Sequence, residues 1–261
     1  MTSSEPGASR TPARVAVLSA VALLATNVAL TGCTSRSSAN GPAPTSAAPA
    51  SAAPTGASER KADAYPVALV RRQVSVHEAP DPDSDSVELS MTTSLGTRRV
   101  LRVLRAAANG QWLQVRVPSR PNNTEGWVRA ADVTIRAVRH HIAIDLSERT
   151  LVLSEDGSPV LTTSVAVGTP DNPTPTGEFF ITDKVATKAG GAYGPYAFGL
   201  SAWSETLSEF GGGDGQIGLH GTNQPELIGR AVSHGCIRLP NKVVSQLAAL
   251  LPIGVPVDVK V

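Results

Sequence analysis

The sequence predicts a mainly β fold with one helix, and three observations support this. Aromatic residues make up 4% of the 261 residues, whereas glycine and proline number 23 and 20. Short runs of alternating apolar and polar residues recur along the chain, and turn-forming segments separate them. One segment near the C-terminus has the apolar spacing of an amphipathic helix. We therefore expect two β-rich units, with one clear helix in the second.

The charge balance disfavours nucleic acid as a partner. Lysine and arginine together number 23, aspartate and glutamate 22, so the formal net charge is +1. Proteins that bind nucleic acid usually carry a strong basic excess or a basic face. The hydrophobic fraction of 41% is enough to form a substantial core.

Residues 1–33 have the pattern of an export signal. Arg10 and Arg14 precede an apolar stretch at residues 15–30, which is too short and too interrupted for a spanning helix. The stretch ends in LTGC, which resembles the lipobox of bacterial lipoproteins. The resemblance implies that Cys33 is lipidated, and that the chain is exported and anchored to the outer face of the cytoplasmic membrane. An ordinary signal peptide or a single-pass anchor is the alternative.

Residues 34–62 are dominated by serine, alanine, proline, glycine and threonine. Such a segment cannot pack a core, and we expect a disordered, flexible linker. If Cys33 carries lipid, Cys236 has no partner left for a disulfide, because the chain has two cysteines. An unpaired thiol in an exported protein is a candidate reactive group.

Residues 65–135 contain several short apolar alternations between the turn segments APDPDSDS, SLGT, AANGQW and SRPNNTEG. Short strands at this spacing favour a small β-barrel. The run ANGQWLQVRV…TEGWVRAADV resembles the bacterial SH3-like module over most of residues 72–135; an immunoglobulin-like sandwich is the alternative. Either would serve to position the rest of the chain, through a ligand such as cell-wall glycan or as a spacer.

Residues 139–261 form the second predicted unit. HIAIDLSERTLVLSEDG indicates a hairpin, and PVLTTSVAVG, EFFITDKV and GQIGLHGT indicate further strands. We expect a helix over about 242–251, capped by Asn241 and ended by Pro252, and then a closing strand over 255–261. One face of that helix would carry Val243, Val244, Leu247, Leu250 and Leu251.

The segment SHGCIRLP at residues 233–240 places a thiol beside an imidazole. A free cysteine is mostly protonated at neutral pH, so a nucleophilic cysteine needs a nearby base or cation. His234 is adjacent in sequence, but His220 comes from another segment and can approach the thiol of Cys236 at a suitable angle. Gly235 would allow close approach of the backbone, and the N–H groups of Gly235 and Cys236 could stabilise an oxyanion.

Two other interpretations of these residues remain open. Cys236 could be an inert small residue of the core. His220, His234 and Cys236 could together bind zinc, with water as a fourth ligand. The chain has neither a Cys-x-x-Cys motif nor a helical histidine pair, so we expect no metal site.

The motifs HGT at 220–222, SHGCIRL at 233–239 and TPTGEF at 174–179 resemble the YkuD-type L,D-transpeptidase domain, over residues 139–261. The resemblance implies that Cys236 is the nucleophile and His220 its base. Gly221 would orient His220 through its main-chain carbonyl, and His234 would be structural or support the oxyanion site.

The same resemblance implies that Ser233 and Arg238 shape the substrate pocket, and that Arg238 could hold a substrate carboxylate. The implied reaction is acyl transfer between peptidoglycan stem peptides: a thioester forms on the cysteine, and an amine of a second stem resolves it into a 3→3 cross-link. Carbapenems should acylate the same thiol. We expect a monomer that needs no cofactor. An L,D-carboxypeptidase, in which water resolves the thioester, and a non-catalytic peptidoglycan-binding lipoprotein are the alternatives.

Residues 184–216 are rich in glycine and contain Tyr193, Tyr196, Phe198 and Trp203. Glycine hinges around amphipathic rings suggest a lid over the cleft, in which Tyr193, Tyr196 and Trp203 contact substrate. A surface loop with its own aromatic cluster is the alternative.

Overall fold

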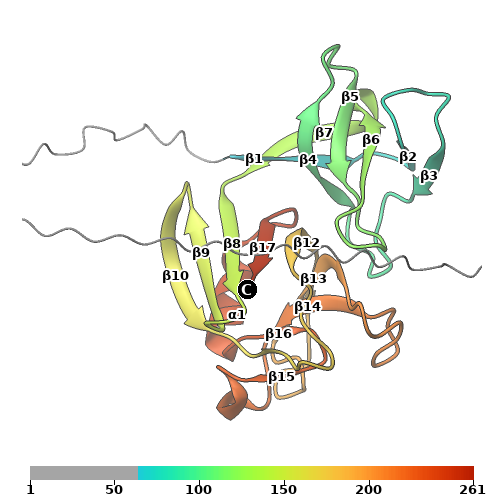
Figure 1. Cartoon of the computed structure of the whole chain (residues 1–261). Helices are drawn as coiled ribbons and strands as arrows, with labels where there is room; N and C mark the ends of the chain where they lie inside the picture. The colour runs from blue at the N-terminus through green and yellow to red at the C-terminus, as the bar shows by residue number, and fades with distance from the viewer. Residues whose placement is uncertain (1–63) are drawn as a thin grey trace, which may run out of the picture. The chain divides into compact units, whose positions relative to one another are not determined.

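A computed structural model describes residues 64–261 and has a mainly β fold with one α-helix in this range (Figure 1), as the sequence predicts. Its strands form a seven-stranded sheet, an eight-stranded sheet and a two-stranded ladder. The predicted export signal, lipobox and linker all lie outside the described residues. Within residues 64–261, no helix is long and apolar enough to cross a membrane.

The seven-stranded sheet has the order β3-β2-β6-β5-β4-β1-β7 and takes up the first predicted unit. Its apolar runs are strands, as expected, and its buried residues are mostly valines, which suit a pleated, half-buried surface. The likeness to the SH3-like module stays a prediction. The strand bounds are β1 Tyr65–Val70, β2 Val74–His77, β3 Ser86–Leu89, β4 Val100–Ala106, β5 Trp112–Arg116, β6 Glu125–Arg129 and β7 Val133–Val138, and the 3-10 helix η1 spans Ala130–Asp132.

The eight-stranded sheet has the order β10-β9-β8-β17-β12-β13-β14-β16. The predicted hairpin is confirmed, because β8 and β9 pair antiparallel from His140↔Glu155 to Asp145↔Thr150. The strand bounds are β8 His140–Asp145, β9 Thr150–Glu155, β10 Ser158–Ser164, β12 Gly177–Ala186, β13 Tyr196–Trp203, β14 Gln216–His220, β16 Ile237–Arg238 and β17 Pro256–Lys260; β11 Val167–Gly168 and β15 Ala231–Ser233 form the small ladder, and the 3-10 helix η2 spans Pro225–Leu227.

The last strand of the chain lies in the middle of this sheet. β17 pairs parallel with β8 and antiparallel with β12, so it joins the predicted hairpin to the strands that carry the histidine and cysteine motifs. The central strand β12 contributes the fully buried side chains of Phe179, Phe180 and Ile181. The sheet therefore packs on a large apolar core, which includes Leu219 and Ile237 next to the histidine and cysteine motifs.

The predicted helix is present as α1, Asn241–Leu250, but two details of the prediction are wrong. Pro240 is the N-cap, and the side chain of Asn241 is used elsewhere: its Oδ1 accepts a hydrogen bond from Thr222 N at 2.8 Å and its Nδ2 donates to Thr222 O at 2.9 Å. Leu250 is 53% exposed and does not belong to the buried face, which Val244 and Leu247 form.

Residues 184–216 do not form one continuous lid. Residues 196–203 are strand β13, which lies between β12 and β14 in the sheet. Phe198 is 1% exposed and belongs to the core of the sheet. The strand was missed because its partly buried positions carry Tyr196, Ala197, Gly199 and Trp203, small or aromatic residues that give no clear polar alternation. The two flanking segments, 187–195 and 204–215, are loops.

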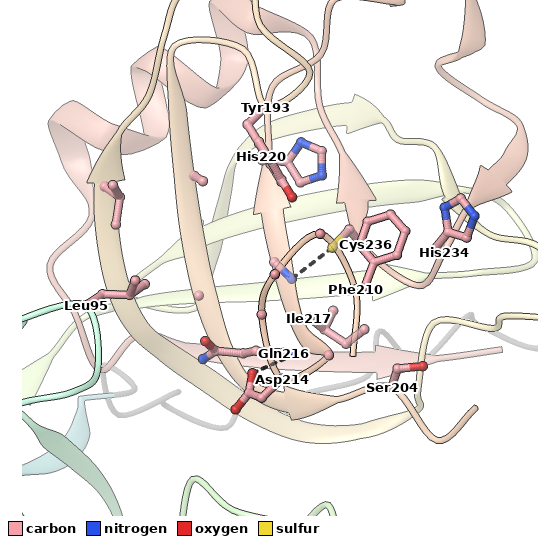
Figure 2. Close-up of a pocket in the computed structure, with 18 of the residues that line it drawn as sticks. Leu95, Tyr193, Ser204, Phe210, Asp214, Gln216, Ile217, His220, His234 and Cys236 are labelled. Atoms are coloured by element: carbon pink, nitrogen blue, oxygen red, sulfur yellow. Dashed lines mark hydrogen bonds between the residues drawn. The ribbon is translucent and has the colours of Figure 1, made fainter. Parts of the chain in front are cut away.

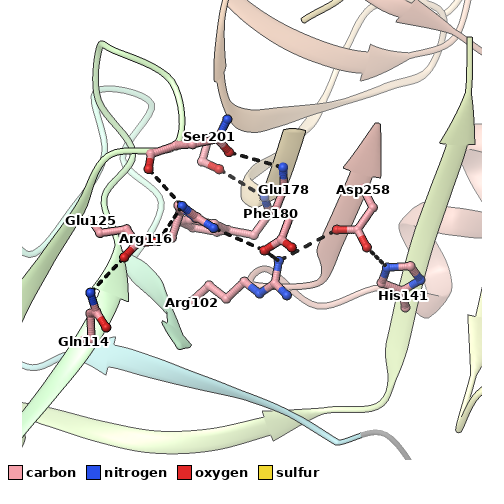
Figure 3. A network of polar contacts seen from close by, with 10 residues as sticks. Arg102, Gln114, Arg116, Glu125, His141, Glu178, Phe180, Ser201 and Asp258 are labelled. Atoms are coloured by element: carbon pink, nitrogen blue, oxygen red, sulfur yellow. Dashed lines mark hydrogen bonds and ion pairs between the residues drawn. The ribbon is translucent and has the colours of Figure 1, made fainter. Parts of the chain in front are cut away.

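The two β-rich units contact each other through apolar and charged groups. Ile253 packs with the cluster of Val67, Val100 and Val138. Beside this cluster, Arg116 pairs with Glu178 of β12, as Figure 3 shows. Figure 3 also shows Arg102 near Asp258, at 3.8 Å, and Asp258 hydrogen-bonded to His141 at 2.8 Å.

Candidate active site

The position of Cys236 follows from a parallel strand pair. β16 pairs with β14 in the register Leu219↔Ile237 and His220↔Arg238. Cys236 directly precedes β16, so it lies beside Gly218 of β14. Side chains two residues apart on a strand point to the same face, so His220 shares the face of Gly218. Strand pairing thus brings together the histidine and the cysteine, which are sixteen residues apart in the sequence.

The thiol lies over the backbone of Gly218. Gly218 N–H donates a hydrogen bond to Cys236 Sγ at an N···S distance of 3.4 Å, drawn as a dashed line in Figure 2. Burial raises the pKa of the Cys236 thiol above its ordinary value, although the Gly218 bond and the charge of Arg238 act in the opposite direction. Cys236 is therefore a protonated thiol in the resting protein.

His220 ends β14 and is 5% exposed. Its Nδ1 lies 2.6 Å from the main-chain oxygen of Gly221, which can only accept a hydrogen bond, so Nδ1 carries the proton and Nε2 is free to accept one. Burial lowers the pKa of His220 to about 4, the charge of Arg238 lowers it too, and the Gly221 bond opposes both. The imidazole is therefore neutral near physiological pH.

Cys236 and His220 line the same cavity (Figure 2). Both groups are neutral, so the resting pair is a thiol beside an imidazole base and not a preformed thiolate–imidazolium ion pair. A proton must pass from sulfur to the ring as the sulfur attacks a substrate. The arrangement thus suits nucleophilic catalysis with general-base assistance.

The turn before the cysteine is held by Ser233, which is 1% exposed. Its hydroxyl donates to Cys236 O at 2.5 Å and accepts from Gly235 N–H at 3.1 Å. The Gly235 N–H is therefore occupied and is not the free oxyanion donor that the sequence suggested. Cys236 N–H has no hydrogen-bond partner within the described residues, so it is the available donor of this turn.

Gly235 cannot be replaced by a larger residue without strain. Its φ is +114°, and a Cβ there would lie 2.8 Å from Ile217 Cδ1. Its carbonyl oxygen accepts a 2.8 Å hydrogen bond from Thr174 Oγ1, which in turn accepts from Gly168 N–H. Thr174 belongs to the TPTGEF motif and supports the cysteine turn. The motif is visible in the sequence, but the contact of Thr174 with Gly235 is not.

The cavity around the thiol has a volume of about 550 Å³. Figure 2 shows Tyr193 and Phe210 near the histidine and cysteine, with Leu95 of the first unit at another side of the cavity. The Tyr193 ring packs edge-to-face on His220, with ring centroids 4.7 Å apart. Arg238 and Cys236 also line a second, smaller cavity of about 130 Å³.

Of the three aromatic residues predicted to contact substrate, the structure places one at the site. Tyr193 lines both cavities, whereas Tyr196 and Trp203 line neither. Tyr196 packs against the core, and Trp203 Nε1 donates to Asp214 Oδ2 at 2.9 Å. Phe210, which the sequence did not single out, contributes a further ring to both cavities.

The remaining predicted residues also lie at the cavities. His234 is exposed, and its ring stacks on Phe210 with centroids 4.6 Å apart. Arg238 Nη1 donates to Gln224 Oε1 at 3.3 Å, and no carboxylate within residues 64–261 pairs with it. Its charge is thus available to an anionic group. In the same range, no group of three His, Cys, Asp or Glu residues is arranged to hold a metal ion.

Comparison with known proteins points to one family. Residues 139–259 match the family model of the L,D-transpeptidase catalytic domain, YkuD. The YkuD protein of Bacillus subtilis is 38% identical over 122 residues, which are 47% of this chain and 66% of the relative. The YqjB protein of the same species is 37% identical over 100 residues, which are 35% of this chain and 54% of the relative.

The chain spans about two thirds or less of the length of these Bacillus relatives. Among solved structures, the chain is similar to an L,D-transpeptidase from Mycobacterium smegmatis, with 16% sequence identity and a TM-score of 0.41. The match covers 62% of this chain and 82% of that one. Residues 139–259 are thus similar to the L,D-transpeptidase catalytic domain of the YkuD type.

Proposed function

We propose that the chain is a peptidoglycan L,D-transpeptidase that forms 3→3 cross-links through a thioester on Cys236. One observation carries the proposal: a buried, neutral His220, with its Nδ1 bonded to Gly221 O, lines the same cavity as the only cysteine thiol of the described chain. L,D-transpeptidases act on peptidoglycan peptides, and residues 139–259 match their catalytic domain.

The first half-reaction would transfer the acyl group to sulfur. Cys236 Sγ attacks the carbonyl carbon of the diaminopimelate residue in a tetrapeptide stem, while His220 Nε2 takes the thiol proton. When the tetrahedral intermediate collapses, the bond to D-alanine breaks, and His220 returns the proton to the leaving amine. The thioester then remains on Cys236.

The second half-reaction would use the same base. The amine of a second stem attacks the thioester carbonyl, His220 takes a proton from that amine, and the C–S bond breaks. The departing sulfur takes the proton back from His220, so the thiol is regenerated and a new amide joins the two stems. The free Cys236 N–H would stabilise the oxyanion in both steps, and Arg238 would bind a carboxylate of the stem.

Mass spectrometry of the reaction products tests this proposal. The full chain, Cys236→Ala and His220→Ala would each be incubated with a disaccharide-tetrapeptide. We expect a cross-linked dimer that has lost one D-alanine with the wild type and not with either variant. Free tripeptide without dimer would instead make the chain an L,D-carboxypeptidase. If neither product forms and a carbapenem leaves no adduct on Cys236, the chain is a binding lipoprotein.

For the location, we propose an exported monomer anchored by lipid on Cys33 and facing the cell wall. The support is the LTGC segment after a basic and then apolar stretch, together with a substrate that lies outside the membrane. Cell fractionation tests the anchor. The Cys33→Ala variant should leave the membrane fraction, and its retention there at the wild-type level would refute lipidation at this residue.

A further inference from the structure

The segment 204–215, here called the site loop, forms one wall of the thiol cavity. It joins β13 to β14 and contributes Leu207, Phe210 and several glycines to the cavity lining. Phe210 stacks on His234, next to the turn that carries the cysteine. The position of this loop therefore determines the shape of the space in which a substrate must fit.

The site loop makes few contacts with the rest of its own unit. Gly211, Gly212 and Gly215 have φ values of +59°, +85° and +78°, and glycine allows many other backbone conformations at the same positions. Two short turns shape it, one closed by Ser204 Oγ and one by the mutual backbone bonds of Phe210 and Gly213. Its base is closed by Ser204 N–H, which donates to Gly215 O at 2.9 Å. Its ties to the rest of its own unit are the bond of Trp203 Nε1 to Asp214 Oδ2, the bond of Thr206 Oγ1 to Asn172 Oδ1, and the stacking of Phe210 on His234.

The first β-rich unit adds three bonds from one side chain. Arg120 Nη1 donates to Ser204 O at 2.5 Å, and its Nη2 donates to Leu207 O at 3.0 Å and to Asp214 O at 2.9 Å. These oxygens lie at the start, in the middle and near the end of the loop. A planar guanidinium with several N–H groups can satisfy three such acceptors at once, and a charged donor strengthens each bond.

Asn122 holds the residue immediately before the loop. Its Nδ2 donates to Trp203 O and its Oδ1 accepts from Trp203 N–H, both at 2.8 Å. This paired contact imitates one step of a β-ladder at the end of β13. Gly215 allows the approach of the guanidinium, because a Cβ there would lie 2.9 Å from Arg120 Nη2 and 2.5 Å from Leu207 O.

We propose that Arg120 and Asn122 are positioning residues for acyl transfer, through which the first β-rich unit holds the site loop in its substrate-binding shape. The inference rests on the proposed function of the Cys236 site. It gives the first unit a direct part in substrate binding, in addition to any spacing or wall-binding role.

The competing explanation is that Arg120 merely holds the two units together. Arg116 serves as the comparison, because it bridges the units through Glu178 and touches no residue of the site loop. Arg136 is the matched neutral control, an exposed arginine of β7 whose side chain makes one hydrogen bond within residues 64–261, to the neighbouring Ile135 O.

Three measurements on the full chain test the inference in Arg120→Ala, Arg120→Lys, Asn122→Ala, Arg116→Ala and Arg136→Ala. The first is the KM and kcat for D-alanine release from a disaccharide-tetrapeptide. The second is cleavage by a glutamate-specific protease at the exposed Glu205 and Glu209 of the site loop. The third is the rate at which iodoacetamide alkylates Cys236.

We expect Arg120→Ala to raise KM about tenfold, with a smaller change in kcat, and to speed cleavage of the site loop about tenfold. Asn122→Ala should act in the same direction. Arg120→Lys should restore part of both effects, because an ammonium can reach some of the carbonyls. Alkylation should not slow, since Cys236 keeps its bonds to Gly218 and Ser233.

The inference is overturned if Arg120→Ala matches Arg136→Ala in both KM and loop cleavage, or if Arg116→Ala reproduces both of its effects. The proposed function fails separately, if the wild type releases no D-alanine. In that case loop cleavage still decides whether Arg120 holds the loop.

Discussion

Two groups of titratable side chains in this protein are partly or wholly removed from water, yet they differ in charge. At the contact between the two units, Arg116 and Arg102 lie beside Glu178 and Asp258. Burial alone would raise the pKa of Asp258, but the hydrogen bond with His141 and the charges of His141 and Arg102 lower it overall. In the cavity, burial raises the pKa of Cys236 and lowers that of His220.

The difference lies in the partners. A buried charge persists where an opposite charge or a strong hydrogen bond offsets the lost hydration, and a buried group without such a partner becomes neutral. The unit contact therefore retains ions, which hold the two parts together. The cavity retains a neutral acid and a neutral base, between which a proton can move when a substrate arrives.

The largest expected effect concerns the neutral base. His220→Ala should lower kcat/KM for D-alanine release by about 10²–10⁴-fold, because the thiol loses its proton acceptor. His140→Ala is the matched control, since His140 lies on β8 and does not line the thiol cavity. An equal loss in both variants would mean that His220 is not the base.

The next effect concerns the charged contact. Arg116→Ala should lower the free energy of unfolding by about 2–4 kcal/mol, because it removes the hydrogen bonds to Glu125 Oε1, Glu178 Oε2 and Asn123 O. Partial exposure of both glutamates keeps the loss modest. Chemical denaturation measures it against Arg136→Ala, which should stay within about 0.5 kcal/mol of wild type. Equal stability of the two variants would show that the Arg116 contact does not stabilise the fold.

A third effect is the acid sensitivity that His220 imposes. The unfolded imidazole binds a proton below about pH 6.5, whereas the folded one does so only below about pH 4. The unfolded state therefore binds more protons in this window, and stability must fall as pH falls through it. The contribution of His220 is up to roughly 3 kcal/mol.

Denaturation curves of wild type and His220→Gln at several pH values isolate this contribution. The wild type should lose more stability than the variant on acidification from about pH 6.5 to about pH 4. Parallel losses in the two proteins would contradict a buried neutral imidazole.

The smallest expected effect concerns the thiol itself. The alkylation rate of Cys236 should rise with pH, with a midpoint above that of a cysteine in a short SHGCIRLP peptide, because burial raises its pKa. Arg238→Ala should move the midpoint higher still, since the arginine charge favours the thiolate. A midpoint below that of the peptide would reveal a preformed thiolate.

The sequence predicts the local parts of this site better than the contacts that complete it. The hairpin of β8 and β9 follows from alternating residues within one short segment, and the cysteine motif is itself a continuous segment. β13 was missed because small and aromatic residues at its partly buried positions leave little alternation of polarity. Asn241 was assigned to the helix because capping is a local rule, whereas its actual partner, Thr222, lies on another segment.

Sequence patterns predict neither the parallel pairing of β14 with β16 nor the bonds of Arg120 to the site loop. Both depend on segments that only the complete fold brings together. Thr174 is an intermediate case, because its motif is visible in the sequence but its bond to Gly235 O is not.

The most direct test of the account is to trap the acyl-enzyme. The wild-type chain would be mixed with disaccharide-tetrapeptide, quenched in acid within seconds and digested. Mass spectrometry would then measure the mass of the peptide that contains Cys236. The account predicts an added disaccharide-tripeptide acyl group on Cys236, with D-alanine released in equal amount. Cross-linked product without any adduct on Cys236, or an adduct on another residue, would contradict it.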